Sequence, residues 1–222
     1  MGKDKLKRFE EIKNFSNVLE APAMEPYEKK GKWHKDIFKN NNPIVLELGC
    51  GKGEYSVGLA RMYPNKNFVG VDIKGNRIYI GAKESLEEEL ENVVFLRTRI
   101  DFIDNFFDTD EIDEIWLTFS DPQPKKPRKR LSSKPFINRY KKFLKKDGKI
   151  HVKTDSDLLF EFTEEEIQSE NYKCHSLTWD LYGEDYFGQL SEEQRKTFEI
   201  RTHYEKLFSS KGSVIKYCCF SV

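Results

Sequence analysis

The chain has 222 residues, enough for one well-buried domain and few for two, so we expect a single domain. Its 38 Lys and Arg residues balance its 38 Asp and Glu residues, so net charge gives no attraction to nucleic acid or membranes, and such a partner needs a local patch. The four cysteines lack C-x-x-C spacing and no apolar run approaches a membrane span, which argues against a metal site, an anchor and a secretory signal and favours a cytoplasmic protein.

Residues 1–42 are mostly polar, and we expect them to form a basic, partly mobile N-terminal arm ahead of a single domain at 43–222. A few apolar residues in this arm are spaced as in one helical stripe, so part of the arm is expected to fold over the domain; they are Phe9, Ile12, Phe15 and Val18. A basic arm of this kind either contacts RNA phosphate or is a solvated tail, and both readings stay open.

The stretch from residue 44 to 53 joins a short apolar strand to the start of a helix. Gly49, Gly51 and Gly53 stand at alternate positions, where they let the backbone turn sharply and let a ligand approach without meeting a Cβ. Glu54 occupies the place of the third small residue in the dinucleotide fingerprint, so a nicotinamide cofactor is disfavoured. The lysine of this turn is not followed by Ser or Thr, which excludes a P-loop. A tight turn without any ligand is the alternative.

The acidic Glu47 precedes these glycines and completes the pattern E-x-G-x-G-x-G at a strand end. This pattern resembles the first motif of the class I S-adenosylmethionine methyltransferases. The cofactor of those enzymes carries a sulfonium and an ammonium group but no phosphate, so a carboxylate beside it is favourable. The turn therefore indicates S-adenosylmethionine as the cofactor.

Alternating helices and strands follow the turn. We expect a helix at 55–62, a strand at 67–72 and a helix whose apolar stripe runs from residue 78 to 90. Asp72 ends this strand about twenty residues beyond the glycines, the distance at which a βαβ unit presents a carboxylate to a ribose diol. Asp72 can also be read as the N-cap of the next helix.

The rest of the chain continues in the same way. Further strands are predicted at 93–96, 112–119, 149–154 and 214–220, and further helices at 135–144 and 158–168. The stretch at 174–187 is too aromatic for an open linker. This alternation predicts an α/β fold with a parallel sheet whose carboxyl edge carries the site.

Acidic residues stand at or just past the ends of the predicted strands: Glu47, Asp72, Asp101, Asp121 and Asp155. The carboxyl ends of parallel strands meet at one edge of a sheet, so one shared pocket explains these acids better than five separate helix caps do. Asp101 can accept a hydrogen bond from an adenine amino group, although a role as a cap is equally open.

The loop from Phe119 to Leu131 reads F-S-D-P-Q-P-K-K-P-R-K-R-L. Asp121 stands between a strand end and two prolines, whose φ angles are fixed near about −65°, so the loop is stiff where it holds the carboxylate. Five of the six residues from Lys125 to Arg130 are basic. On a neutral chain this run is either a phosphate-binding patch beside the predicted methyl donor or a solvated surface run.

With this loop the chain resembles the bacterial tRNA (guanine-N7)-methyltransferases, over about residues 44–220. The resemblance is carried by the E-x-G-x-G-x-G turn, Asp72, Asp101, the D-P-x-P-K-K loop with its basic continuation, the strand-end Thr154-Asp155, and T-H-Y-E at 202–205. Members of the family usually have P-D-P-W-P-K in the loop, whereas Ser120 and Gln123 replace the first Pro and the Trp here.

The resemblance implies a Rossmann-like class I methyltransferase fold with a seven-stranded, mostly parallel sheet and helices on both faces. It implies an enzyme that methylates N7 of guanine 46 in the variable loop of tRNA. Cofactor contacts are implied for Glu47, Gly49, Gly51, Gly53, Asp72, Asp101 and Asp121, and Asp121 is also the catalytic candidate. RNA or guanine contacts are implied for Lys125, Asp155, Thr202, His203, Tyr204 and Glu205.

Two other interpretations stay open from the sequence. One is a class I methyltransferase that acts on another RNA or on a small molecule, and the other is a non-catalytic RNA-binding module with the same fold. A small-molecule enzyme would have little use for the basic run after Pro124, and the intact glycine turn speaks against a loss of activity. The sequence does not distinguish a monomer from a homodimer.

Overall fold

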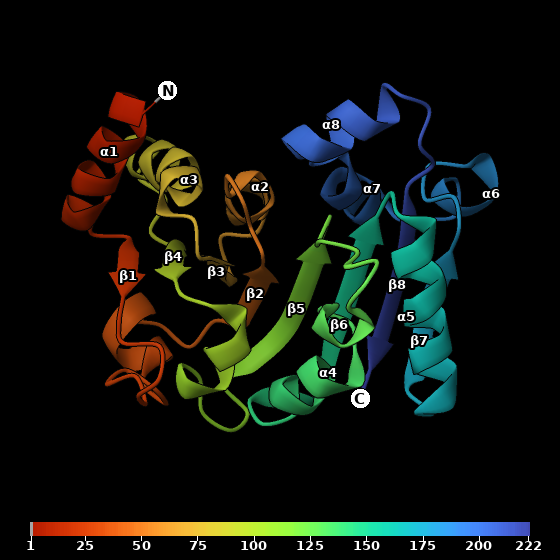
Figure 1. The fold of residues 1–222 in the computed structure, drawn as a ribbon, viewed down its shortest axis with the longest axis horizontal. Helices are drawn as coiled ribbons and strands as arrows, with labels where there is room; N and C mark the ends of the chain where they lie inside the picture. Colours follow the sequence, from red (N-terminus) through yellow and green to blue (C-terminus); the bar gives the residue numbers. More distant parts are fainter. Residues whose placement is uncertain (1) are drawn as a thin grey trace.

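The computed structural model describes residues 2–222, in which eight strands form one sheet with helices on both faces (Figure 1). The strands are β1 (Val18–Glu20), β2 (Ile44–Leu48), β3 (Asn67–Asp72), β4 (Val93–Arg97), β5 (Ile112–Thr118), β6 (Leu144–Thr154), β7 (Lys173–Thr178) and β8 (Lys216–Ser221). The α-helices are α1 (Gly2–Glu11), α2 (Glu54–Met62), α3 (Gly75–Glu87), α4 (Lys134–Tyr140), α5 (Asp157–Ser169), α6 (Glu184–Phe187), α7 (Glu192–Glu199) and α8 (His203–Ser209). In this described part of the chain, no helix is long and apolar enough to cross a membrane.

The strand order creates a crevice at the centre of the sheet. From edge to edge the order is β1-β4-β3-β2-β5-β6-β8-β7, and only β8 runs antiparallel to its neighbours β6 and β7. The chain moves from β2 outward to β3 and β4 and then returns to place β5 on the other side of β2, parallel to it. The order reverses between β2 and β5, and ligands bind outside the carboxyl ends of strands at such a point. In Figure 1 the arrowheads of β5 and β6 point toward α7 and α8.

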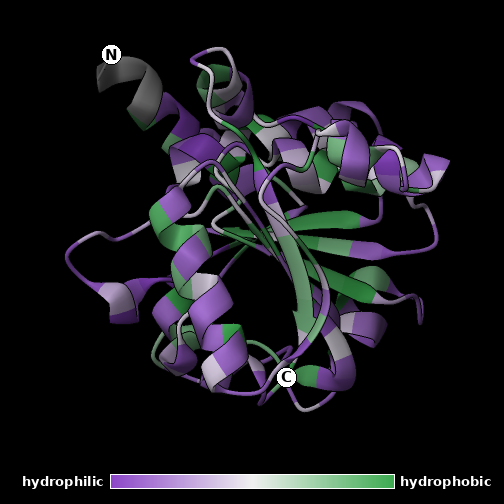
Figure 2. Cartoon of the chain, turned by 90° about the vertical axis from the view of Figure 1, so that its right-hand side faces the viewer, coloured by the Kyte–Doolittle hydropathy of each residue, from purple (hydrophilic) through white to green (hydrophobic). Residues whose placement is uncertain are grey.

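The sheet is covered on both faces, which explains why its central strands are apolar without alternation. All residues of β2 are buried, with Ile44, Leu46 and Leu48 in one apolar cluster and Val45 in another. The first cluster includes residues of α4 and α5, and the second includes residues of α2, α3 and α7. Figure 2 shows the strands in green in the interior, beneath helices that are mostly purple.

The sequence analysis gave no range for two of the strands, β1 and β7. Val18–Glu20 pair in parallel with residues 95–97 of β4 and form one edge of the sheet. Val18 therefore begins an edge strand instead of ending a helical stripe. The predicted fold class is confirmed, but the count of seven strands that the resemblance implied was one too few. The three residues of β1 are too short a run to show a periodicity.

The described segment before position 43 is anchored to the rest of the chain by buried side chains. Trp33 is fully buried, its indole N–H donates to the Phe106 carbonyl at 2.8 Å, and its backbone N–H donates to the Glu111 carboxylate at 3.0 Å. Phe38 is buried in the same apolar cluster. The boundary expected at residue 43 therefore does not separate this segment from the sheet, because a few large apolar side chains anchor a mostly polar stretch.

Candidate active site

A cavity of about 650 Å³ lies at the carboxyl ends of β2, β3, β5 and β6. Its lining includes eight of the residues singled out from the sequence: Glu47, Gly49, Gly51, Asp72, Asp121, Asp155, Thr202 and Tyr204. The other five, which are Gly53, Asp101, Lys125, His203 and Glu205, lie outside the lining. Four of the five strand-end acids therefore converge on one cavity, and its volume is typical of a small-molecule or cofactor site.

The three glycines of the turn have different surroundings. Gly49, Gly51 and Gly53 all have left-handed backbone conformations, with φ of 84°, 57° and 76°. A Cβ on Gly49 or Gly51 would have no neighbouring atom within 4 Å, because these two residues face the cavity. A Cβ on Gly53 would lie 2.5 Å from the ring of Phe95. Two glycines therefore leave room for a ligand, and the third leaves room for the packing of α2.

Asp72 fastens the glycine turn to the end of β3. One carboxylate oxygen accepts from the Gly51 N–H at 3.0 Å, and the other accepts from the Lys74 N–H at 2.8 Å. The second bond closes a local turn before α3, whose N-cap is Lys74, so the reading of Asp72 as that N-cap is wrong, and its contact with a ribose stays a prediction. Because Asp72 also lines the cavity, it shapes the turn and presents negative charge to the ligand space.

Glu47 is the most buried acid in the cavity wall. One carboxylate oxygen accepts from the backbone N–H and the hydroxyl of Ser56, at 3.0 and 2.5 Å, and the other accepts from the Thr118 hydroxyl. Burial raises the pKa of Glu47 to about 7, although these hydrogen bonds lower it in part. The carboxylate is therefore held rigidly, and a nearby cation would favour its charged form.

Asp121 follows β5 and is exposed to the cavity. Its carboxylate accepts from the backbone N–H of Gln123 at 2.9 Å. Phe119 and Gln123 both have positive φ values, 50° and 44°, so the loop folds tightly around this carboxylate. The stiff loop predicted from the prolines thus brings the catalytic candidate to the same cavity as the glycine turn.

The basic run after Asp121 is divided between surface and core. Its surface part is Lys125, Lys126, Arg128 and Lys129, which are all exposed. Arg130 is only 4% exposed, donates from Nε to the Pro122 carbonyl at 2.8 Å, and stacks its guanidinium over the ring of Phe162. The expectation that Arg130 belongs to the phosphate-binding patch is therefore wrong. It braces the loop that carries Asp121.

Asp101 is engaged by two cations beside the cavity. Its carboxylate pairs with Lys129 at 3.2 Å and with Arg99 at 3.3 Å. Burial raises the pKa of this carboxyl, but Lys129 and Arg99 outweigh burial, and the pKa lies below its ordinary value. Asp101 itself does not line the cavity, whereas the preceding residue Ile100 and the ion-pair partner Lys129 do.

Helix α8 and the end of β6 complete the wall. Thr202 caps α8 by accepting from the Glu205 N–H at 3.1 Å, and Tyr204 lies under the guanidinium of Arg77. Asp155 is half-buried, and burial raises its pKa. Glu205 is fully buried, so its carboxylate does not face the cavity in this structure.

Comparison with known proteins identifies the family. A family model described as "Putative methyltransferase" matches residues 41–218. The chain is 50% identical over 224 residues to a tRNA (guanine-N(7)-)-methyltransferase of Bacteroides fragilis, covering 99% of this chain and 86% of the relative. It is 44% identical to the protein of the same name from Christiangramia forsetii, covering 100% and 99%. The chain belongs to the tRNA (guanine-N7)-methyltransferase family.

A solved structure supports the fold of this family member independently. The 16S rRNA methyltransferase KamB is similar with a TM-score of 0.62 at 14% identity, covering 85% of this chain and 91% of that chain. A likeness at this identity concerns the fold alone. The family resemblance that was inferred from the loop and the glycine turn is confirmed.

The cavity fits the cofactor of a methyltransferase family. The open sides of Gly49 and Gly51 form a cradle that a Cβ would fill, and the carboxylates of Glu47 and Asp72 line the same cavity. Gly49, Gly51 and Asp72 would hold S-adenosylmethionine, with Asp72 at the ribose and Glu47 contributing charge toward the cationic end. When bound, this cofactor supplies an electrophilic methyl group on a sulfonium.

Several residues that form the site could not be identified from the sequence of this family member. Ser56 and Thr118 fix Glu47, Arg77 and Phe208 line the cavity, and Lys153 is fully buried behind it. A hydroxyl or a lysine at the end of a strand is too common to single out. Thr118 does precede Asp121 at the end of a predicted strand, which is the one hint that was available.

Proposed function

We propose that this chain transfers the methyl group of S-adenosylmethionine to N7 of a guanine in tRNA, and that guanine 46 in the variable loop is the target. The observation that carries the proposal is that Asp121 shares one cavity with Gly49, Gly51 and Asp72, next to an exposed basic loop. Membership of the family supports the reaction and the choice of tRNA. With tRNA as its substrate, the protein would act in the cytoplasm.

The chemistry asks the protein for positioning and for charge stabilisation. Guanine N7 has an in-plane lone pair at neutral pH, so its attack on a methyl group needs no general base. During the transfer, positive charge develops on the imidazole ring of the base. The Asp121 carboxylate would orient the guanine by accepting from its N1–H and N2–H₂ groups, and it would stabilise the developing charge. Asp155 lines the same cavity and would support this role.

The exposed basic loop supplies the RNA-binding side of the proposal. Lys125, Lys126, Arg128 and Lys129 surround the short turn that follows Asp121. Cations of this kind bind phosphate and release counterions, which gives affinity for RNA without sequence specificity. A small-molecule substrate would leave this group without a role, so tRNA is favoured.

The variant Asp121→Asn tests the proposal. We expect it to lower kcat for tRNA methylation by about a hundredfold or more, because it removes the negative charge from the position where positive charge develops. Purified protein, S-adenosylmethionine and bulk tRNA are incubated, and the digested tRNA is analysed for 7-methylguanosine by mass spectrometry. The modified position is then mapped within the variable loop.

Asp147→Asn serves as the matched control, because Asp147 is exposed in the turn within β6 and outside the cavity lining. It should retain full turnover. If the wild-type protein produces no 7-methylguanosine, the proposed reaction is refuted. Near-wild-type turnover by Asp121→Asn would refute only the role of this residue.

A further inference from the structure

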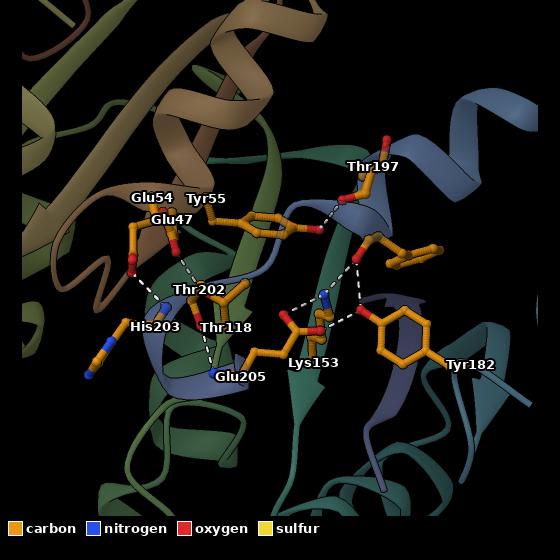
Figure 3. A network of polar contacts seen from close by, with 11 residues as sticks. Glu47, Glu54, Tyr55, Thr118, Lys153, Tyr182, Thr197, Thr202, His203 and Glu205 are labelled. Carbon is orange, nitrogen blue, oxygen red and sulfur yellow. Dashed lines mark hydrogen bonds and ion pairs between the residues drawn. The ribbon is translucent and has the colours of Figure 1, made fainter. Parts of the chain in front are cut away.

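A buried ion pair lies behind the cavity wall. Lys153, one residue before the end of β6, and Glu205 of α8 are both fully buried, with 2.9 Å between the ammonium nitrogen and a carboxylate oxygen (Figure 3). The ammonium also donates to the Phe198 carbonyl at 3.1 Å. A buried charge without a partner is strongly unfavourable, so each of these two residues requires the other.

The pair is the centre of a wider network that fixes the segment from α7 to α8. The single proton of the Tyr182 hydroxyl is shared between two acceptors, the second carboxylate oxygen of Glu205 and the Phe198 carbonyl, the latter at 2.7 Å. The Tyr55 hydroxyl of α2 donates to the Thr197 carbonyl at 3.2 Å. These bonds give the aromatic stretch around Tyr182 a structural purpose, because it encloses the pair.

Helix α8 depends on this network for its position. The helix has only seven residues, which is too short to be stable by itself in water. Besides the ion pair, it is held at its start by Glu54, whose carboxylate accepts from the His203 N–H at 3.0 Å. Thr202 and Tyr204, which line the cavity, therefore stand where the ion pair and Glu54 place them.

We propose that Lys153 and Glu205 are positioning residues for the methyl transfer, which set α8 and with it Thr202 and Tyr204 in the cavity wall. Both residues then act through the position of α8, and Glu205 makes no contact with the guanine. This changes the role that the family resemblance implied for Glu205, and it rests on the proposed function, since one readout is tRNA methylation. Burial lowers the pKa of Lys153, which is consistent with a charge that is retained only because Glu205 faces it.

A double-mutant cycle separates positioning from direct contact. The variants are Lys153→Met, Glu205→Met and the combination of both, because methionine has a similar length and replaces a buried pair by apolar packing. Lys196→Met is the matched control, since Lys196 on α7 forms an exposed pair with Glu192 at 2.6 Å. For each protein we measure kcat/KM with tRNA and the hydrogen exchange rates of the backbone amides of residues 203–209.

Each single variant should lower kcat/KM by about tenfold or more and speed the exchange of the α8 amides by a similar factor, because it leaves a buried charge without its partner. The double variant should recover both quantities to within about threefold of the wild type, since no charge is then left unpaired. The control variant should behave as the wild type. If the single variants unfold altogether, the activity and exchange rates of the double variant still test the inference.

Three results would overturn the inference. In the first, the single variants lose activity while α8 stays protected from exchange. In the second, the double variant recovers protection but not activity, which would mean that Glu205 contacts the substrate. In the third, the two residues show no coupling, either because the single variants change neither quantity or because the double variant recovers neither. An inactive wild-type protein would instead refute the proposed function, and the exchange rates would still test whether the pair positions α8.

Discussion

The two walls of the cavity are built in different ways. On one side, the wall formed by the glycine turn and β3 is held mostly by contacts that are close in sequence: Glu47 and Ser56 are nine residues apart, and Gly51 and Asp72 are 21 apart. The exception is the bond between Thr118 and Glu47, which spans 71 residues but joins the ends of two neighbouring strands. On the other side, the wall formed by α8 is held by contacts between distant residues. Lys153 and Glu205 are 52 residues apart. The bond between Glu54 and the His203 N–H spans 149 residues.

The difference concerns which wall can change shape independently. The glycine turn is fixed to the carboxyl edge of a parallel sheet, and it loses its shape only if the sheet does. Helix α8 lies outside the sheet and depends on side-chain bonds and one buried ion pair. Segments held in this way open at a lower free energy than a sheet does. We therefore expect the cofactor side of the site to be rigid and the α8 side to be adjustable.

The largest effects are expected from substitutions in the rigid wall, which is the wall formed by the glycine turn and β3. Gly51→Ala should weaken the binding of S-adenosylmethionine by about a hundredfold, because the new Cβ points into the open cavity. Its cost to folding should be only about 1–2 kcal/mol, the penalty for a left-handed alanine. Gly53→Ala should instead lower the free energy of unfolding by about 2–5 kcal/mol, because its Cβ meets the Phe95 ring as well.

Isothermal titration with the cofactor and denaturant unfolding measure these two quantities in the same preparations. If Gly51→Ala binds the cofactor as the wild type does, the claim that Gly51 leaves room for the ligand is wrong. If Gly53→Ala is as stable as Gly51→Ala, the claim that Gly53 leaves room for the Phe95 ring is wrong. The wild-type protein at the same pH is the reference for both variants.

The rigid wall is also the part that the sequence revealed well. The strand Asn67–Asp72 was predicted with both of its ends correct, and the helix predicted from residue 55 begins at Glu54. Asp72 was assigned to the site from its place at a strand end and its distance to the glycines, and the family resemblance agreed. Contacts within one βαβ unit leave a regular spacing in the sequence, so they can be inferred without a structure.

The adjustable wall was hidden because its bonds have no regular spacing. Lys153 stands in a predicted strand that also contains Lys149, and nothing in its local sequence distinguishes a buried ammonium from a solvated one. Glu205 was expected to face the substrate, and its burial follows only from the packing of α8 against β6. Val18 begins a strand too short to recognise. These features are tertiary, so propensity and periodicity could not show them.

A smaller effect is expected from changing the charge of the rigid wall with pH. Burial raises the pKa of Glu47 to about 7 from an ordinary value of 4.5, so the carboxyl is mostly protonated at pH 6 in the protein without ligand. A cationic cofactor favours the charged form. Affinity for S-adenosylmethionine should therefore fall as pH drops below 7, by up to about tenfold per pH unit, with release of up to about one proton per cofactor bound.

The raised pKa of Glu47 affects folding stability in the opposite direction to cofactor affinity: it favours folding at low pH. Because the folded protein holds the Glu47 proton more tightly than the unfolded chain, this residue's contribution to stability is present below pH 4.5 and is lost as pH rises through about 7.

Titration calorimetry between pH 5.5 and 8 in buffers of different ionisation enthalpy counts the protons released on cofactor binding. Glu47→Gln is the control and should remove this pH dependence. An affinity that stays constant in the wild-type protein would contradict the assignment.

The smallest effect is expected within a single loop, where the exposed Arg128 and the buried Arg130 are two residues apart. Arg128 is exposed, whereas Arg130 is buried against Phe162 and bonded to the Pro122 carbonyl. If Arg128 contacts one phosphate, Arg128→Ala should reduce the slope of log affinity for tRNA against log salt by roughly 0.7 to 0.9, without a change in stability. Arg130→Ala should leave that slope unchanged and lower the free energy of unfolding by about 1–3 kcal/mol.

Filter-binding titrations of tRNA at several salt concentrations, together with thermal unfolding, measure both quantities. The two arginines have the same charge and nearly the same place in the sequence, so any difference between the variants comes from their surroundings. Equal losses of slope would mean that Arg130 leaves its place beside Phe162 when RNA binds, and the loop would then belong to the adjustable side of the site. Unequal losses would show that it belongs to the rigid side, with Asp121 held still between Pro122 and Gln123 while the cations around it meet the phosphates.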